Sequence, residues 1–181
     1  MNEYSIRFIK PEDAQRVLDI YAPYITKSNI SFEYEVPTIE EWQQRIATIT
    51  AQYPWLVCEH EGVIVGYAYA GQHRARTAYQ WSVESAIYIA EDFLGKGAGK
   101  LLYQKLFELL RQQGYVNVFA GMTLPNEKSE GLHKSCGFET IGVFRNIGYK
   151  NNRWHDVQWM QLDLQEHRIG MNMPVSISAL N

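Results

Sequence analysis

The chain has 181 residues, 46% of them hydrophobic and 20% charged, and its formal net charge is −3. This length suits one globular domain with a full core, and the composition excludes disordered and fibrous classes. The slightly acidic balance gives no basic surface for nucleic acid. No apolar run is long enough to cross a bilayer, and the first residues lack a signal-peptide pattern, so no membrane partner is expected.

The two cysteines, Cys58 and Cys136, lie far apart and lack metal-binding or redox spacing. They indicate reduced thiols, which predicts a cytoplasmic protein. The five histidines show no ligand spacing such as H-E-x-x-H, so no metal is predicted.

The N-terminal part predicts a strand and two helices. Alternation over residues 5–9 favours a strand, and a helix begins at Pro11, with apolar side chains at helical spacing up to Tyr21. Pro23 is expected to kink or end this helix. Residues 27–37 are typical of a loop, and a capping box at residues 38–41 begins a second helix that continues through Ile49.

Strands dominate the next part of the chain. Residues 55–60 and 63–70 predict a hairpin around Glu61-Gly62. Residues 71–78 are polar and basic. Residues 81–90 are rich in β-branched and aromatic side chains and predict a further strand.

A glycine-rich turn follows this strand and leads into an amphipathic helix that begins at Lys100 and runs to Arg111. Gly95, Gly97 and Gly99 let the backbone approach a ligand and point its N–H groups into one concavity. A helix N-terminus directly after such a turn suits a phosphate or pyrophosphate. The spacing fits neither a P-loop nor a dinucleotide fingerprint, and an ordinary strand-to-helix turn is the alternative.

The last third of the chain predicts a strand over residues 116–120 and a helix over residues 126–135 that ends at Gly137. A hairpin of residues 138–145 and 156–164 follows, joined by a loop over residues 148–154. The tail over residues 165–181 is irregular and is expected to be mobile or docked on a partner subunit. Together these elements predict a mixed α/β sheet.

Residues 94–99, Leu-Gly-Lys-Gly-Ala-Gly, are similar to the acyl-CoA-binding motif Q/R-x-x-G-x-G/A of the GNAT superfamily of N-acetyltransferases, with leucine at the first position. The likeness runs in order from about residue 6 to residue 164. Several further blocks look like the phosphinothricin and methionine sulfoximine/sulfone acetyltransferase branch. They are residues 79–85, 124–126, 132–133, 137–138, 148–150 and 154–157.

The resemblance implies the GNAT fold, with about seven strands splayed between the fourth and fifth and about four helices. Acetyl-CoA would enter between residues 81–90 and 116–120. The domain would comprise residues 1–164, followed by a tail of residues 165–181, and the protein would be a homodimer.

Acetyl transfer to an amine needs a neutral amine and hence a general base. Glu84 is the leading candidate. On a pleated strand it shares a face with Ser82, Ala86 and Tyr88, and an unpaired carboxylate in such an apolar strand is costly. A glutamate paired with an arginine or lysine across the sheet is the alternative. The resemblance favours a base, acting directly or through a water.

His133 is the second catalytic candidate. By resemblance it follows Leu132 where many GNAT enzymes have a tyrosine that protonates the leaving thiolate. A histidine titrates near neutrality, so it suits either the amine proton or the sulfur, and a structural histidine is the alternative. If Glu84 and His133 converge in the fold, their roles overlap.

By resemblance, the backbone of Ile87, Tyr88 and Ile89 would pair with the pantetheine amides of acetyl-CoA. Asn126 would hydrogen-bond the pantetheine arm, and Ser135 would reach it from the same helix. Leu94 removes one polar phosphate contact, for which backbone N–H groups could compensate. The pyrophosphate would lie on the glycine turn, which comprises Gly95, Lys96, Gly97, Ala98, Gly99 and Lys100.

Arg74, Arg76 and Tyr79 precede Glu84, and by resemblance this region binds the anionic part of a small amino-acid analogue. Guanidinium donors suit a carboxylate beside a phosphinate or sulfone, and a solvated basic loop is the alternative. Phe32 is a hydrophobic plug on the core or, by resemblance, part of the pocket wall. Residues 154–156 receive no catalytic role and would close the sheet or line a dimer contact.

The sequence therefore predicts an acetyl-CoA-dependent N-acetyltransferase acting on a small amino-acid analogue such as phosphinothricin, methionine sulfoximine or methionine sulfone. Direct attack in a ternary complex is expected, because no cysteine lies at the motif to carry the acetyl group. A GNAT enzyme acetylating a protein N-terminus or lysine is one alternative, and a non-catalytic acyl-CoA-sensing module is another.

Overall fold

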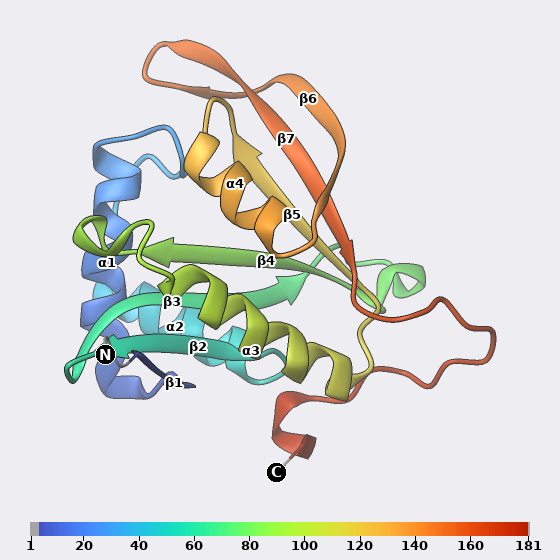
Figure 1. Ribbon diagram of the computed structural model, residues 1–181. Coiled ribbons are helices and arrows are strands. Elements are labelled where there is room, and N and C mark those ends of the chain that lie inside the picture. The colour runs from blue at the N-terminus through green and yellow to red at the C-terminus, as the bar shows by residue number, and fades with distance from the viewer. Residues whose placement is uncertain (1–3, 181) are drawn as a thin grey trace.

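The computed structural model describes residues 4–180 as a seven-stranded mixed sheet with helices on both faces (Figure 1). The strand order is β1-β2-β3-β4-β5-β7-β6. The strands are β1 Tyr4–Phe8, β2 Trp55–His60, β3 Val63–Gln72, β4 Ser82–Ile89, β5 Asn117–Thr123, β6 Glu139–Lys150 and β7 Arg153–Asp163. The helices are α1 Ala14–Thr26, α2 Ile39–Thr50, α3 Ala98–Gln113 and α4 Glu127–Ser135, with short 3-10 turns at Pro11–Asp13, Thr77–Tyr79, Glu91–Phe93 and Ile177–Leu180.

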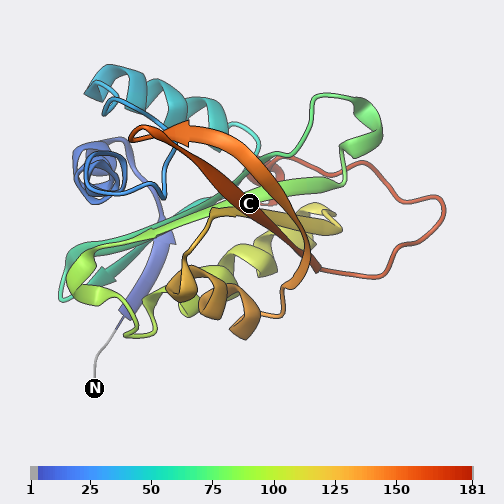
Figure 2. The ribbon, with the colours of Figure 1, turned by 90° about the horizontal axis from the view of Figure 1, so that it is seen from above.

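Helices α1 and α2 lie on one face of the sheet, and α3 and α4 lie on the other (Figure 2). Each face has its own buried cluster, because alternate residues of the central strands point to opposite faces. On β2, Trp55 and Val57 pack with α1 and α2, whereas Leu56 and Cys58 pack with α3. Burial on both faces explains why this strand is apolar without alternation.

The central strands β4 and β5 are parallel but pair at three positions only: Ser82–Asn117, Val83–Val118 and Glu84–Phe119. Beyond Glu84 the two strands diverge, and Figure 1 shows the opening between them. β4 continues to Ile89 along β3, and β5 continues to Thr123 along β7. The predicted mixed sheet with its parting between the fourth and fifth strands is therefore confirmed.

The β6–β7 hairpin is longer than the sequence predicts. β6 continues to Lys150, and Asn151 and Asn152, both at positive φ, form the turn to Arg153, so the expected loop over residues 148–154 is wrong. Asparagine tolerates the left-handed conformation of a two-residue hairpin turn, which lets both strands run up to it. Gly148 does not break the strand but lies against the Phe32 ring.

Residues 154–156 belong to β7 and stabilise this hairpin. The buried His155 ring hydrogen-bonds the Lys150 carbonyl at 3.0 Å, and Asp156 accepts the Asn146 N–H at 2.8 Å, where the pairing with β6 is irregular. Trp154 packs against Tyr149 on the surface. These contacts stabilise the hairpin, and a further role of Trp154 in a dimer contact stays a prediction.

Two helix boundaries differ from expectation. α1 does not end at Pro23 but continues to Thr26. The proline removes one helical N–H, yet Ile25 beyond it is buried and the Lys27 N–H bonds the Pro23 carbonyl, so packing outweighs the local loss. α3 begins at Ala98 rather than Lys100, directly after Gly97, whose φ is 96°.

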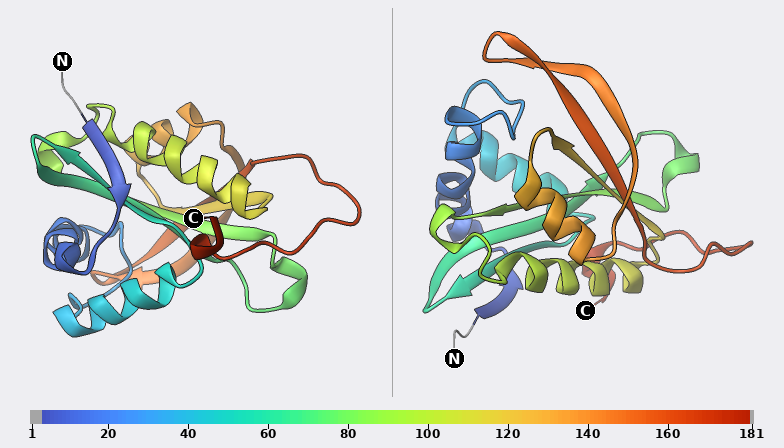
Figure 3. Two further views of the ribbon diagram at one scale, coloured as in Figure 1. Left: turned by 90° about the horizontal axis from the view of Figure 1, so that it is seen from below. Right: turned by 45° about the horizontal axis from the view of Figure 1, so that its top comes forward.

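The end of the tail packs on the chain itself (Figure 3). The N–H groups of Val175 and Ile177 donate to the carbonyls of Gln113 and Gln52, and the buried Gln113 side chain donates to Val175 at 2.8 Å. Ile177 and Leu180 contact the cluster beneath α3. Residues 1–3 and 181, which the predicted domain and tail include, lie outside the described residues. Over residues 4–180, none of the helices has the length and apolar character that crossing a bilayer requires.

Candidate active site

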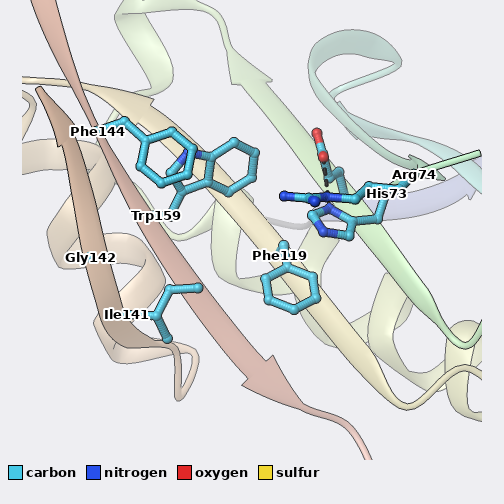
Figure 4. A pocket seen from close by; sticks show the side chains of 8 residues that line it. His73, Arg74, Phe119, Ile141, Gly142, Phe144 and Trp159 are labelled. Atoms are coloured by element: carbon cyan, nitrogen blue, oxygen red, sulfur yellow. Dashed lines mark hydrogen bonds and ion pairs between the residues drawn. The ribbon is translucent and has the colours of Figure 1, made fainter. Parts of the chain in front are cut away.

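A pocket of about 240 Å³ opens where β4 and β5 part (Figure 4). Its walls come from the segment after β3, from β4 and β5, and from the β6–β7 hairpin. Carbon-rich side chains form one side and the polar groups gather on the other. The lining residues are His73, Arg74, Glu84, Phe119, Ile141, Gly142, Phe144 and Trp159.

The Glu84 carboxylate enters this pocket from the last position at which β4 pairs with β5. Its side chain is 40% exposed, and Oε1 lies 2.8 Å from Nδ1 of His73. The alternative of an arginine or lysine partner across the sheet is wrong, because the Glu84 carboxylate pairs with this imidazole. Glu84 is therefore both satisfied and open to the pocket.

The His73 ring is enclosed, with 12% of its side chain exposed. It stacks on Phe119 with ring centroids 4.4 Å apart, and the edges of Tyr79 and Trp159 lie about it at 6.0 and 6.2 Å. Sequence reasoning treated His73 only as part of a basic segment. The position of His73 in the site depends on the register of β4 and β5, in which Phe119 pairs with Glu84. The sequence does not reveal this register.

The residues predicted to bind the acceptor do not all line the pocket. Arg74 lines the pocket, and its guanidinium lies over the Tyr79 ring, 5.3 Å from the centroid. Arg76 is exposed and is not among the lining residues. Phe32 packs against Gly148 and tilts toward His155, with centroids 6.1 Å apart, and is likewise not among the lining residues. The plug alternative describes Phe32 better than the pocket wall.

His133 and Glu84 do not converge. His133 is buried between α3 and α4, and its Nε2 lies 2.8 Å from the Tyr103 hydroxyl, which in turn lies 3.3 Å from Oγ of Ser85. Ser85 and Glu84 are neighbours on one strand and point to opposite faces. His133 therefore approaches the sheet from the α3 side, and Glu84 projects from the other.

The hydrogen bonds of His133 define its tautomer. Nδ1 lies 2.7 Å from the Ser129 carbonyl, which only accepts, so Nδ1 carries the proton and Nε2 accepts from Tyr103. Burial lowers the pKa of His133 below its usual 6.5, which favours the neutral ring.

The glycine turn has the geometry of an anion cradle. Gly95 and Gly97 have φ of 72° and 96°, and α3 begins directly after them, with its first N–H groups free of helical partners. A Cβ added at either glycine would meet open space, so it is the backbone conformation that requires them. Lys96 lies over the Phe93 ring at 5.3 Å, and the exposed Lys100 belongs to the first turn of α3.

The divergence of β4 and β5 exposes one edge of β4. Ala90 donates to Val65 on β3, so alternation assigns the backbone groups of Tyr88 to β3 and those of Ile87 and Ile89 to the opening. The Ile89 carbonyl there accepts from the Tyr24 hydroxyl at 2.5 Å. Of the three residues predicted to pair with pantetheine, Ile87 and Ile89 therefore have the required orientation.

The two α4 candidates already make local bonds. Asn126 caps the helix, its side chain accepting from the Ser129 N–H at 3.2 Å. Ser135 donates to the Leu132 carbonyl at 2.7 Å. The Asn126 amide N–H groups remain available to a ligand. Within residues 4–180, no group of three or more histidine, cysteine, aspartate or glutamate side chains could hold a metal ion.

Comparison with known proteins agrees with this geometry. Residues 6–159 match the family model described as an acetyltransferase (GNAT) domain. Phosphinothricin N-acetyltransferase of Streptomyces viridochromogenes is 40% identical over 160 residues, which cover 88% of this chain and 87% of that protein. The L-methionine sulfoximine/L-methionine sulfone acetyltransferase of Salmonella typhimurium is 31% identical over 167 residues, covering 90% and 96%. A phosphinothricin acetyltransferase from Sinorhizobium meliloti, solved in complex with AcCoA, has a TM-score of 0.87 at 31% identity, covering 93% of this chain and 95% of that one.

Proposed function

The chain belongs to the GNAT acetyltransferase family, and on that premise we propose that it transfers acetyl from acetyl-CoA to the amino group of a small amino-acid analogue. Phosphinothricin, methionine sulfoximine and methionine sulfone represent the substrate class, in accord with the names of its relatives. The observation that carries this proposal is the position of Glu84 beside Arg74, at the last paired residue before β4 and β5 part.

Each end of the opening supports one half of this reaction. The turn of residues 95–100 offers N–H groups and two lysines to the pyrophosphate of the carrier. The free edge of β4 at Ile87 and Ile89 offers amide partners to the extended pantetheine arm, with Asn126 across the gap. The thioester then lies at the closed end of the opening, beside Glu84.

The pocket supports a small acceptor that carries a carboxylate. Arg74 supplies a guanidinium for it, and the wall formed by Phe119, Phe144 and Trp159 suits a short, largely apolar side chain. Glu84 takes part in removing the amine proton, and the amine attacks the thioester of acetyl-CoA directly in a ternary complex. His133, on the opposite face, orients the Tyr103 hydroxyl, and a role for it at the leaving sulfur remains a prediction.

A protein N-terminus or lysine is the alternative acceptor. A pocket of about 240 Å³ favours a free small molecule over a peptide, which needs a longer groove. A non-catalytic acyl-CoA-binding module would have no need for a pocket-facing carboxylate. Both alternatives are outcomes of the assay below.

We infer that the enzyme is a homodimer joined through the β6–β7 hairpin. β6 is the edge strand of the sheet, and such edges and large apolar patches are usually covered. Exposed apolar side chains follow the hairpin: Ile141, Val143, Phe144, Ile147, Tyr149 and Trp154. Sedimentation equilibrium is expected to give a dimer for the wild type and a weaker one for Ile147→Lys, and a wild-type monomer would contradict this.

Two further assignments follow from the same premise. We propose that residues 1–164 are one acetyltransferase domain and residues 165–181 a C-terminal tail, of which Ile177 and Leu180 pack against the cluster beneath α3. The thiols of Cys58 and Cys136 are unpaired, which suits a reducing cytoplasm.

Coenzyme A thiol release, measured with phosphinothricin, methionine sulfoximine, methionine sulfone and N-terminal peptides, tests the proposal. The wild type is expected to turn over at least one amino-acid analogue, and Glu84→Gln to lower kcat about 100-fold or more. His133→Ala measures the contribution from the other face. Turnover of peptides alone would favour the first alternative, and heat of acetyl-CoA binding without turnover the second. Glu84→Gln within a few-fold of wild type would remove Glu84 from the chemistry.

A further inference from the structure

His73 and Glu84 form a hydrogen-bonded imidazole–carboxylate pair at the closed end of the β4–β5 opening. We infer that Nε2 of His73 is the atom that takes the amine proton, and that Glu84 acts through this ring by holding and charging it. This inference rests on the proposed function and deepens it, because it separates the proton acceptor from the carboxylate on the strand.

The tautomer of His73 supports this division. An ionised carboxylate has only acceptor oxygens, so the 2.8 Å contact requires the hydrogen on Nδ1. The neutral ring then has its lone pair on Nε2. Figure 4 shows this second nitrogen on the side of the ring away from Glu84, turned toward the space between Phe119 and Trp159. A group that is to accept a proton from a bound amine needs a free lone pair, which this tautomer supplies.

Packing fixes the orientation of the imidazole. The ring lies face to face with Phe119 at an interplanar angle of 19°, while Tyr79 and Trp159 meet it edge-on. Its side chain is 12% exposed, against 40% for Glu84. A ring clamped between aromatic neighbours and a carboxylate loses little freedom when substrate binds, which is the property of a preorganised base.

The charged groups around His73 fit the same role. Glu84 on β4 stabilises the imidazolium, Arg74 is the other charged side chain that lines the pocket, and the Tyr79 ring lies against His73 without lining the pocket. The lining residues from β5, β6 and β7 are uncharged. When the carboxylate of an amino-acid acceptor binds Arg74, the amino group on the adjoining carbon comes next to His73, which lines the same pocket.

The proton balance is simple. The substrate ammonium loses one proton to Nε2 and becomes an amine with a free lone pair. Its nitrogen bonds the acetyl carbon as the carbon–sulfur bond breaks, and the second proton that nitrogen loses ends on sulfur as the coenzyme A thiol. The imidazolium returns its proton to solvent, so one proton is released per turnover.

Steady-state kinetics of His73→Gln, Glu84→Gln and the double variant test the inference. Glutamine keeps a donor for Glu84 but takes no proton, so His73→Gln is expected to lower kcat about 100-fold, with KM within a few-fold. Because the two residues act as one unit, the double variant is expected to lose no more than the worse single variant. His167→Gln, an exposed histidine in the tail, is the matched control.

Two results would overturn the inference while the proposed function stands. One is His73→Gln turning over within about three-fold of wild type while Glu84→Gln is inactive, which makes Glu84 the direct base. The other is additive losses in the double variant. Long-range ¹⁵N–¹H NMR of the free protein gives a readout independent of turnover: protonated Nδ1 is expected on His73, and a ring protonated on Nε2 would equally reject the assignment. Absence of turnover by the wild type on every amine would instead reject the proposed function.

Discussion

The Tyr103 hydroxyl and Nε2 of His133 lie 2.8 Å apart in the interior between α3 and α4. This hydrogen bond joins His133 to the face of β4 opposite the pocket, so His133 and Glu84 do not converge and belong to separate networks. Each of the two residues can therefore be substituted without removing a direct contact of the other.

His133 gives the fold a pH dependence. Burial lowers its pKa below the 6.5 of a free histidine, so the unfolded chain binds a proton that the folded state resists. The stability that this pKa difference gives the folded state is fully present above pH 6.5 and is lost as the pH falls below that value. Urea unfolding at pH 8, 6 and 5 is expected to show a smaller loss for His133→Gln than for the wild type, although the variant is less stable at pH 8 by about 2 kcal/mol.

The exposed His167 is the control for this measurement. His167→Gln is expected to leave the free energy of unfolding at pH 8 within about 0.5 kcal/mol of the wild type. An unchanged slope in His133→Gln would mean that other groups dominate the acid response.

Lys150 fastens the loop before α2 to the end of β6. Its ammonium, on a residue only 4% exposed, donates to the carbonyls of Ile25, Ser28 and Ser31 at 2.7, 3.1 and 2.7 Å. Lys150→Met leaves these buried acceptors unsatisfied and is expected to cost about 3 kcal/mol in denaturant unfolding.

The same substitution at an exposed lysine separates the effect of removing a charge from the effect of removing the buried bonds of Lys150. Lys105→Met removes an exposed pair with Glu108 and is expected to change stability by less than about 0.5 kcal/mol. Hydrogen exchange over residues 27–37 is expected to speed up in Lys150→Met alone. Equal effects of the two substitutions would show that the three carbonyl bonds carry no net stability.

Arg74 and Arg76 differ by their place relative to the pocket. Arg74→Gln is expected to raise KM for carboxylate-bearing acceptors about 10- to 100-fold, because a charge-assisted bond contributes about 1.5–3 kcal/mol, with a smaller effect on kcat. Arg76→Gln is expected to have a smaller effect on KM, since Arg76 is exposed outside the lining. Equal changes in KM would restore Arg76 to the acceptor site.

Gly148 and Gly142 form a second matched pair, on β6. A Cβ at Gly148 would lie 2.1 Å from the Phe32 ring, whereas one at Gly142 would meet nothing within 4 Å. Gly148→Ala must displace Phe32 and is expected to lower stability by about 1–3 kcal/mol. Gly142→Ala is expected to stay within about 0.5 kcal/mol of wild type or gain stability. Equal melting temperatures for the two variants would mean that Phe32 has room to move.

The glycine turn of residues 95–100 and the strand before it could be predicted because their signals are local. Positive φ requires glycine at residues 95 and 97 whatever the surroundings, and the change from strand to helical periodicity lies in neighbouring residues. The capping box before α2 has the same character: Thr38 and Glu41 bond each other's backbone across one turn.

The partnership at the site depended on tertiary structure. His73 meets Glu84 because β3 and β4 pair in one register, and Phe119 supports the ring because β4 and β5 remain joined up to residue 84. Likewise Pro23 stays helical because Ile25 is buried, and His133 turns away from Glu84 because Ser85 and Glu84 alternate across a sheet. Local sequence therefore determined the glycine turn and most of the elements, whereas strand register, a long-range property without a local code, decided which side chains share the pocket.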